Sequence, residues 1–473
     1  MKTITNLLLA ATIIISTPFA FAAKKIDTIG KAEAINKSPE ASQVISRKLD
    51  DLSIEEETLD NGLKVVVMHL NSNGAVYAGV GYHVGSGDDP RDVVGVSHFL
   101  EHMMFKGTKN ISGEKLKETI GKYNKYKNAF TDYDITFYCY NCNKAFLDID
   151  LKIEADRMQN LALETSEIEK EKKVIIEERK MRSESDPRTK FMEESAFKCI
   201  YLYSNYSYPV IGYLDQIKAC DKKALKKHYD KFYNPSNAFV LIVGDITKDE
   251  AVAKVKKYFG SIKKGEKVER NRVIDPENTG LSYSIDHASA QISMHDLNLI
   301  YKIKREFIDN LKKHLIINIM TSVLAKGQAS VLYENIVDKK ELAYNIDSFL
   351  DIKTCDIGKF SISTVIRENT NSQKIEEEIN QIVYDFADKY LTEALFYKEK
   401  NKMLNEIDLM QDDLTKMGMF IIEHIINNHG IKDIKKVRSI IDSITLADVK
   451  KAAKDIFTKE NRIVKIYSHP KAG

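Results

Sequence analysis

The stretch HFLEHMMFKGT, which runs from His98 to Thr108, places two histidines four residues apart with Glu101 directly before the second. On a helix such residues lie on one face, so His98 and His102 can direct their imidazoles at a common point. Two neutral imidazoles suit zinc, which in catalytic sites takes three protein ligands and keeps one position for water. Glu101 lies on the edge of the same face, where it can accept a proton from that water. The pattern predicts a catalytic zinc helix, and the alternative is a pair of histidines that are only packed or solvated.

A third ligand is expected from the segment EIEKEKKVIIEERKM, which reads as a long charged helix that extends from about residue 146 to 182. Glu171 and Glu178 are seven residues apart and therefore share a face, on which we also expect Val174 and Ile175. A face that mixes carboxylates with apolar residues favours a buried ligand, and Glu171 would orient a ligand histidine or the water. The alternative, an exposed charged helix, explains Glu178 less well.

Length and composition indicate an ordinary globular protein. The 473 residues, 43% of them apolar, suffice for two or three domains with sizeable cores. The 71 lysines and arginines nearly cancel the 69 aspartates and glutamates, so charge gives no argument for nucleic acid or an anionic membrane as a partner.

The first residues, MKTITNLLLAATIIISTPFAFAAKK, have the order of a secretory signal. Lys2 precedes an apolar stretch of residues 7–15, and a small-x-small cleavage site ends at Ala22. Residues 16–18 interrupt the apolar stretch before it reaches the roughly 18 to 20 residues that span a bilayer. We therefore expect residues 1–22 to be a signal peptide and the protein to be periplasmic or secreted, without a stable membrane anchor.

Five cysteines would meet an oxidising compartment after export, and their odd number leaves at least one thiol unpaired. Cys139 and Cys142 have the spacing of a redox motif, but they end a strand-like run instead of a βα turn. This favours incidental thiols or a local disulfide over a redox site.

A weak internal repeat suggests two similar halves. Residues 221–243 and 448–467 each read as a lysine-rich amphipathic helix that leads into a β-branched strand. We expect an N-terminal arm at 23–57, a metal-binding domain at 58–262, a linker at 263–280 and a second domain at 281–473.

With these residues assembled, the chain resembles the pitrilysin/insulinase family of zinc peptidases, especially its shorter bacterial members related to the mitochondrial processing peptidase. The H-x-x-E-H motif, a glutamate separated from it by 75 residues, EADRM at 154–158 and NPSNAFVLIVGD at 234–245 occur in the family's order. The resemblance implies an α+β fold of two homologous α/β domains, each a mainly antiparallel sheet packed against helices, with a metal site only in the first.

The resemblance also implies roles for individual residues. One zinc per chain would be held by His98, His102 and Glu178, with Glu101 as the base and Glu171 in support. The substrate would lie along an edge strand formed by NAFT, that is Asn128, Ala129, Phe130 and Thr131. Main-chain pairing of this kind gives affinity with little sequence preference. The function expected is an exported zinc endopeptidase of unfolded or short polypeptides, and the alternative is a non-catalytic binding or assembly subunit of the same fold.

Two departures from the family pattern affect these expectations. Relatives usually carry glycines just before NAFT, whereas residues 122–127 here are KYNKYK. In the second half Tyr344, which would stabilise the oxyanion, is present, but Val337 stands where the family has an arginine. Some relatives work as pairs in which the second subunit supplies these groups. We therefore expect a homodimer, or a heterodimer with a related chain that supplies the missing arginine.

Overall fold

The computed structural model describes residues 51–471 except 271, 278–279 and 353–355. The predicted signal peptide, most of the predicted arm and Cys355 lie outside these residues. Within the described part of the chain, no helix has the length and apolar character needed to cross a bilayer.

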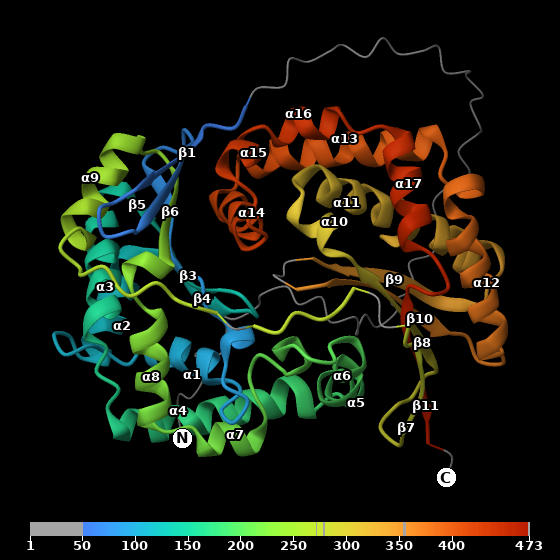
Figure 1. The fold of residues 1–473 in the computed structure, drawn as a ribbon, viewed down its shortest axis with the longest axis horizontal. Helices are drawn as coiled ribbons and strands as arrows, with labels where there is room; N and C mark the ends of the chain where they lie inside the picture. The colour runs from blue at the N-terminus through green and yellow to red at the C-terminus, as the bar shows by residue number, and fades with distance from the viewer. Residues whose placement is uncertain (1–50, 271, 278–279, 353–355, 472–473) are drawn as a thin grey trace, which may run out of the picture. The chain divides into compact units, whose positions relative to one another are not determined.

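The first sheet has the strand order β1-β2-β6-β3-β5-β4 (Figure 1). Its strands are β1 (Ile54–Thr58), β2 (Lys64–His69), β3 (Ala75–Tyr82), β4 (Asn124–Thr131), β5 (Thr136–Asn143) and β6 (Ala238–Gly244). Only β2 and β6 are parallel, and every other pair is antiparallel. The predicted arm is wrong in its last residues: Ile54 is buried and pairs with Met68, so residues 54–57 belong to the sheet.

Helices of the first half cover one face of this sheet. They are α1 (Val96–Met103), α2 (Gly113–Tyr123), α3 (Leu147–Asn160), α4 (Thr165–Arg179), α7 (Leu214–Ala219), α8 (Lys222–Phe232) and α9 (Lys248–Phe259). The short α5 (Pro187–Phe191) and α6 (Phe197–Ile200) instead pack against residues of the second sheet. The helical region predicted over about 146–182 is confirmed, but it consists of two helices, because the chain breaks between α3 and α4. Leu163 there takes a left-handed φ of 49° that a helix cannot contain.

Alternation along the strands divides the core of the first half between two faces. Val65 and Val67 pack with the helices of the first half, whereas Val66 and Met68 belong to a second cluster on the opposite face. Both faces are therefore buried, which explains why all of β6 is buried and apolar.

The same alternation settles the arrangement of the C-x-x-C pair. Cys139 lies in the cluster on one face and Cys142 in the cluster on the other, and both are free thiols. A local disulfide between them is therefore excluded.

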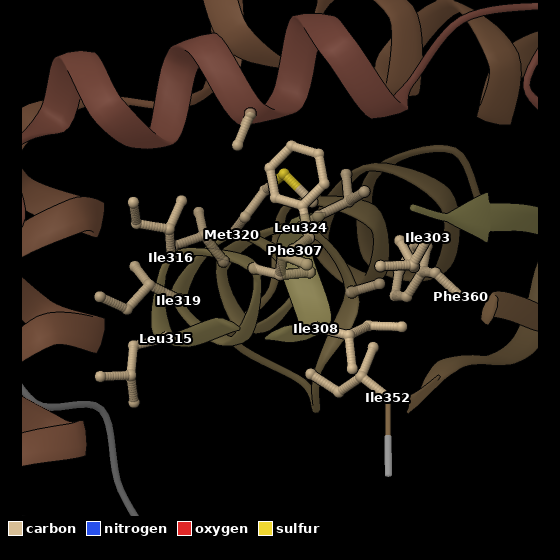
Figure 2. Close-up of a cluster of buried hydrophobic side chains, with 14 of the residues drawn as sticks. Ile303, Phe307, Ile308, Leu315, Ile316, Ile319, Met320, Leu324, Ile352 and Phe360 are labelled. Carbon is tan, nitrogen blue, oxygen red and sulfur yellow. The ribbon is translucent and has the colours of Figure 1, made fainter. Parts of the chain in front are cut away.

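The second sheet has the order β7-β11-β8-β10-β9. Its strands are β7 (Tyr283–Ser289), β8 (Asp296–Ile303), β9 (Ala343–Asp351), β10 (Gly358–Ile366) and β11 (Arg462–Pro470). The helices around it are α10 (Arg305–Asp309), α11 (Leu311–Ala325), α12 (Ser372–Asp385), α13 (Glu393–Met410), α14 (Leu414–Ile426), α15 (Ile431–Lys435), α16 (Val437–Asp442) and α17 (Leu446–Ile456). Figure 2 shows Ile316, Met320 and Leu324 of α11 gathered with Phe360 of β10 in the buried core.

The two sheets repeat one topology. The order β2-β6-β3-β5-β4 of the first corresponds, strand for strand along the chain, to β7-β11-β8-β10-β9 of the second. The parallel pair occupies the same place in both, β2 with β6 and β7 with β11. Helix α8 precedes β6 as α17 precedes β11, which is the repeat that the sequence indicated. The expected fold class, two α/β domains with mainly antiparallel sheets, is confirmed.

Helix α14 of the second half packs on β3 and β6 of the first (Figure 1). A Cβ atom on Gly418 of α14 would lie 2.3 Å from the ring of Tyr77, so a glycine is required for this close approach. The side chain of Asn141 also donates to the hydroxyl of Thr415 at 2.9 Å. One hydrophobic cluster thus contains residues of both halves, and residues from Asp51 onward form a single compact unit.

Candidate metal centre

Helix α1 is anchored at its N-terminus by a buried carboxylate. Asp89 accepts hydrogen bonds from the amide of Gly95 at 2.7 Å, the amide of Ser97 at 3.2 Å and the hydroxyl of Ser97 at 2.6 Å. The same hydroxyl lies 2.8 Å from Nε2 of His228 on α8. Gly95 has a φ of 95°, and a Cβ there would lie 2.5 Å from the carbonyl oxygen of Ile211. These contacts fix the direction in which α1 leaves the loop.

From this anchored helix, His98 and His102 meet Glu178 on α4. One ligand atom from each of the three residues lies within 4.8 Å of the others. Nε2 of His98 is 3.7 Å from one oxygen of Glu178, and Nε2 of His102 is 3.3 Å from the other. The structure therefore brings together the three residues expected as ligands.

Glu171 lies where the sequence placed it, next to a ligand histidine. Its carboxylate is 2.9 Å from Nδ1 of His102 and also pairs with Lys106. When His102 is neutral, a proton on Nδ1 held by Glu171 leaves Nε2 with a lone pair that can bind a metal. Two imidazole nitrogens and one carboxylate oxygen then converge, a donor set that fits zinc with a fourth position open.

The protonation states also fit a cation. Burial and the neighbouring His102 lower the pKa of His98 to about 3. Burial alone would raise the pKa of Glu178, but chiefly the hydrogen bond from His102 brings it down to about 2. Burial alone would lower the pKa of His102, but its hydrogen bonds with Glu171 and Glu178 raise it to about 9. At neutral pH His98 is therefore uncharged and Glu178 is ionised, as ligands must be, whereas His102 is protonated and releases a proton when it binds a metal.

Glu101 lies beside the three ligand residues and is held by the substrate strand expected from the sequence. The hydroxyl of Thr131 at the end of β4 donates to Glu101 at 2.6 Å. Burial raises the pKa of Glu101, although the charge of His102 and this hydrogen bond act in the opposite direction. The carboxylate is thus positioned and poised to take up a proton.

The strand β4 contains Asn128, Ala129, Phe130 and Thr131 as its last residues. Within the described chain β4 pairs with β5 alone and so forms an outer edge of the first sheet. The stretch KYNKYK does not lie wholly before the strand, because Asn124 to Lys127 form the first half of β4. The register shifts between Asn124 and Tyr126.

The expectation that Val174 shares the buried ligand face of α4 is not met. Ile175 is buried on the ligand face of α4, but Val174 is 50% exposed and faces solvent. In the second half Tyr344 on β9 is 50% exposed, and among the described residues no hydrogen bond or ring contact joins it to the metal centre. Val337 is 8% exposed and packs in the shared core.

Three basic residues near these groups were not singled out from the sequence. Arg182 pairs with Glu178 at 2.7 Å, and its position four residues further along the helix was the available signal. Lys106, which pairs with Glu171, likewise lies four residues after His102. The guanidinium of Arg367 lies 5.3 Å from the centre of the Tyr344 ring, and its Nε donates to the carbonyl of Ala343 at 3.3 Å. No spacing rule connects Arg367 with Tyr344, because the two strands meet only in the fold.

Comparison with known proteins places related sequences along most of the chain. The family described as "Insulinase (Peptidase family M16)" matches residues 64–209, and "Peptidase M16 inactive domain" matches residues 219–403. A curated relative, zinc protease PqqE of Helicobacter pylori, is 27% identical over 422 residues, which cover 88% of this chain and 93% of the relative.

Solved structures show the same fold. The crystal structure of a protease from Helicobacter pylori superposes with a TM-score of 0.81 at 24% identity, over 89% of this chain and 100% of that one. The crystal structure of the periplasmic protease PqqL from Escherichia coli gives a TM-score of 0.72 at 19% identity, over 90% of this chain and 48% of that one.

Proposed function

Because the chain belongs to peptidase family M16, the insulinase family, we propose that it is an exported zinc endopeptidase that hydrolyses unfolded or short polypeptides. The observation that carries the proposal is the convergence of His98, His102 and Glu178, with Glu101 next to them and bonded to an edge strand. A relative named as a zinc protease, similar over nearly its whole length, adds support.

The residues of this chain take distinct parts in the proposed reaction. When bound by His98, His102 and Glu178, zinc supplies a Lewis acid that lowers the pKa of a water and polarises the scissile carbonyl. Glu101 removes a proton from the attacking water and passes it to the leaving amine nitrogen. Glu171 holds the ring of His102 in the ligating tautomer. The free edge of β4 binds the main chain of the substrate.

We also propose that the protein is exported and that it associates with a second chain. The order of residues 1–22 supports a periplasmic or secreted protein, as does the periplasmic description of the PqqL structure. Val337 supports a second chain, identical or related, that supplies an arginine beside the oxyanion. If that chain is a second copy, Arg367 is a cation that already lies beside its Tyr344.

A comparison of the wild type with Glu101→Gln tests the proposal. Both proteins should bind one zinc, measured by elemental analysis. Glu101→Gln should cleave a quenched-fluorescence peptide about 10²- to 10⁴-fold more slowly, because it cannot carry the proton. The matched control is Glu177→Gln, which changes an exposed carboxylate on α4 and should keep full activity.

The outcomes separate the two functions considered for this fold. Equal zinc with no cleavage by either protein, also after addition of related chains from the same source, would favour the non-catalytic assembly subunit. Equal cleavage by both would remove Glu101 from the mechanism.

A further inference from the structure

We propose that Lys127 makes the enzyme prefer substrates with an acidic side chain about four residues from the scissile bond, on one side of that bond. This inference deepens the proposed function and rests on it, because it requires a peptide paired with the free edge of β4. It concerns the stretch KYNKYK of residues 122–127, which leads directly into NAFT.

The pleat of β4 places Lys127 on the same face as the residues closest to the metal centre. Lys127, Ala129 and Thr131 alternate with Asn128 and Phe130, and the register is regular from Tyr126 onward. Ala129 packs against the cluster that contains residues of α1, whereas Phe130 belongs to the cluster on the opposite face. Lys127 therefore lies on the face that carries α1 and the metal centre.

The hydrogen bond from Thr131 to Glu101 marks where along β4 the reaction takes place. At about 3.3 Å per residue, Lys127 lies roughly 13 Å from that point along the strand. In a paired peptide, the residue about four positions from the scissile bond comes opposite Lys127. Directly opposed side chains in paired strands have Cβ atoms about 5 Å apart, close enough for an ion pair.

Lys127 lacks an acidic partner in the described part of the chain. Its side chain is partly buried, and the groups that act on it electrostatically are the cations Lys117 and Arg157. Burial and these charges lower the pKa of Lys127. By contrast, Lys115 on the neighbouring helix pairs with Glu118 at 2.9 Å. A carboxylate from the substrate would provide the partner that the chain itself does not supply to Lys127.

The test uses one peptide that the wild type cleaves and its variants with a single glutamate moved from five residues before the scissile bond to five residues after it. At each position a glutamine peptide and a lysine peptide serve as references. The enzymes are the wild type, Lys127→Met, Lys127→Glu and, as a control for net charge, Lys122→Met at the exposed end of α2. The readout is the ratio of kcat/KM for glutamate over glutamine, which is independent of the absolute rate of each variant.

The wild type and Lys122→Met should favour glutamate about two- to fivefold at one position, three to five residues from the scissile bond, mainly through KM. Lys127→Met should abolish this ratio, and Lys127→Glu should transfer the preference to the lysine peptide. A ratio near one at every position in the wild type would overturn the inference. So would a ratio in Lys127→Met equal to that of the wild type. In both cases cleavage of the neutral glutamine peptide would leave the proposed function intact. No cleavage of the neutral peptide by the wild type would overturn both.

Discussion

At the scale of single residues, Glu171 fixes the orientation of the ring of a ligand histidine, His102. Its carboxylate faces Nδ1 of His102, while Nε2 of the same ring faces Glu178. The hydrogen bond with His102 and the pairing with Lys106, which follows α1, lower the pKa of Glu171 and keep the carboxylate ionised in a mostly buried position. The ring is therefore oriented before a metal arrives, so the metal does not have to order it.

Replacement of Glu171 by glutamine should weaken zinc binding about 10- to 100-fold, because the ring of His102 loses its charged hydrogen-bond partner. Competition with a chelator of known affinity measures this change. The matched variant is Glu169→Gln on the exposed side of α4, which should bind zinc like the wild type. Unchanged affinity in Glu171→Gln would show that the hydrogen bond does not orient the ligand.

At the scale of elements, the site depends on how α1 is held at its start. Asp89 satisfies two backbone amides at the start of the helix, which have no partner within the helix itself. Ser97 connects Asp89 to His228 and so joins α1 to α8. The direction of the histidine face is set at this end, where Ser97 directly precedes the first ligand, His98.

The variant Asp89→Ala should lose about 2 to 3 kcal/mol of unfolding free energy, because buried amides and a hydroxyl lose their acceptor. It should also bind zinc less tightly, because α1 is free to shift. Urea unfolding and chelator competition measure the two effects. Asp92→Ala, an exposed neighbour, is the control, and equal losses in both variants would contradict the role assigned to Asp89.

The sequence alone was sufficient to predict the parts of the candidate site that lie on single helices. The four-residue spacing of His98 and His102 and the seven-residue spacing of Glu171 and Glu178 each place two side chains on one face, whatever the rest of the fold does. The break between α3 and α4 was not predictable in this way, because it depends on a left-handed Leu163. Nor was the contact between Arg367 and Tyr344, because it depends on the pairing of β9 with β10.

At the scale of the whole molecule, the buried histidines limit stability in acid. His83, His228 and His429 lie in different parts of the fold, and burial is the main cause that lowers the pKa of each to about 4. The unfolded chain, with histidine pKa values near 6.5, binds these protons first as the pH falls. Stability is therefore lost between about pH 6.5 and pH 4 and regained as the pH rises.

Each of these histidines contributes at most one proton, which corresponds to a slope of about 1.4 kcal/mol per pH unit. Urea unfolding at a series of pH values should show this decline. His429→Gln should reduce the slope by up to one proton in this range, whereas His69→Gln, at the exposed end of β2, should change it less. An unchanged slope in His429→Gln would show that this histidine takes up its proton without unfolding.

The packing of α14 against β3 and β6 has a consequence for a chain that has been cut. Because one core contains side chains from both halves, a protease site engineered into residues 263–269 should yield two fragments that stay bound as a noncovalent complex. The nicked protein should elute as one species in gel filtration and keep its zinc, and fragments expressed separately should reassemble when mixed. Separation of the fragments under native conditions would mean that the peptide connection, and not the shared core, holds the halves together.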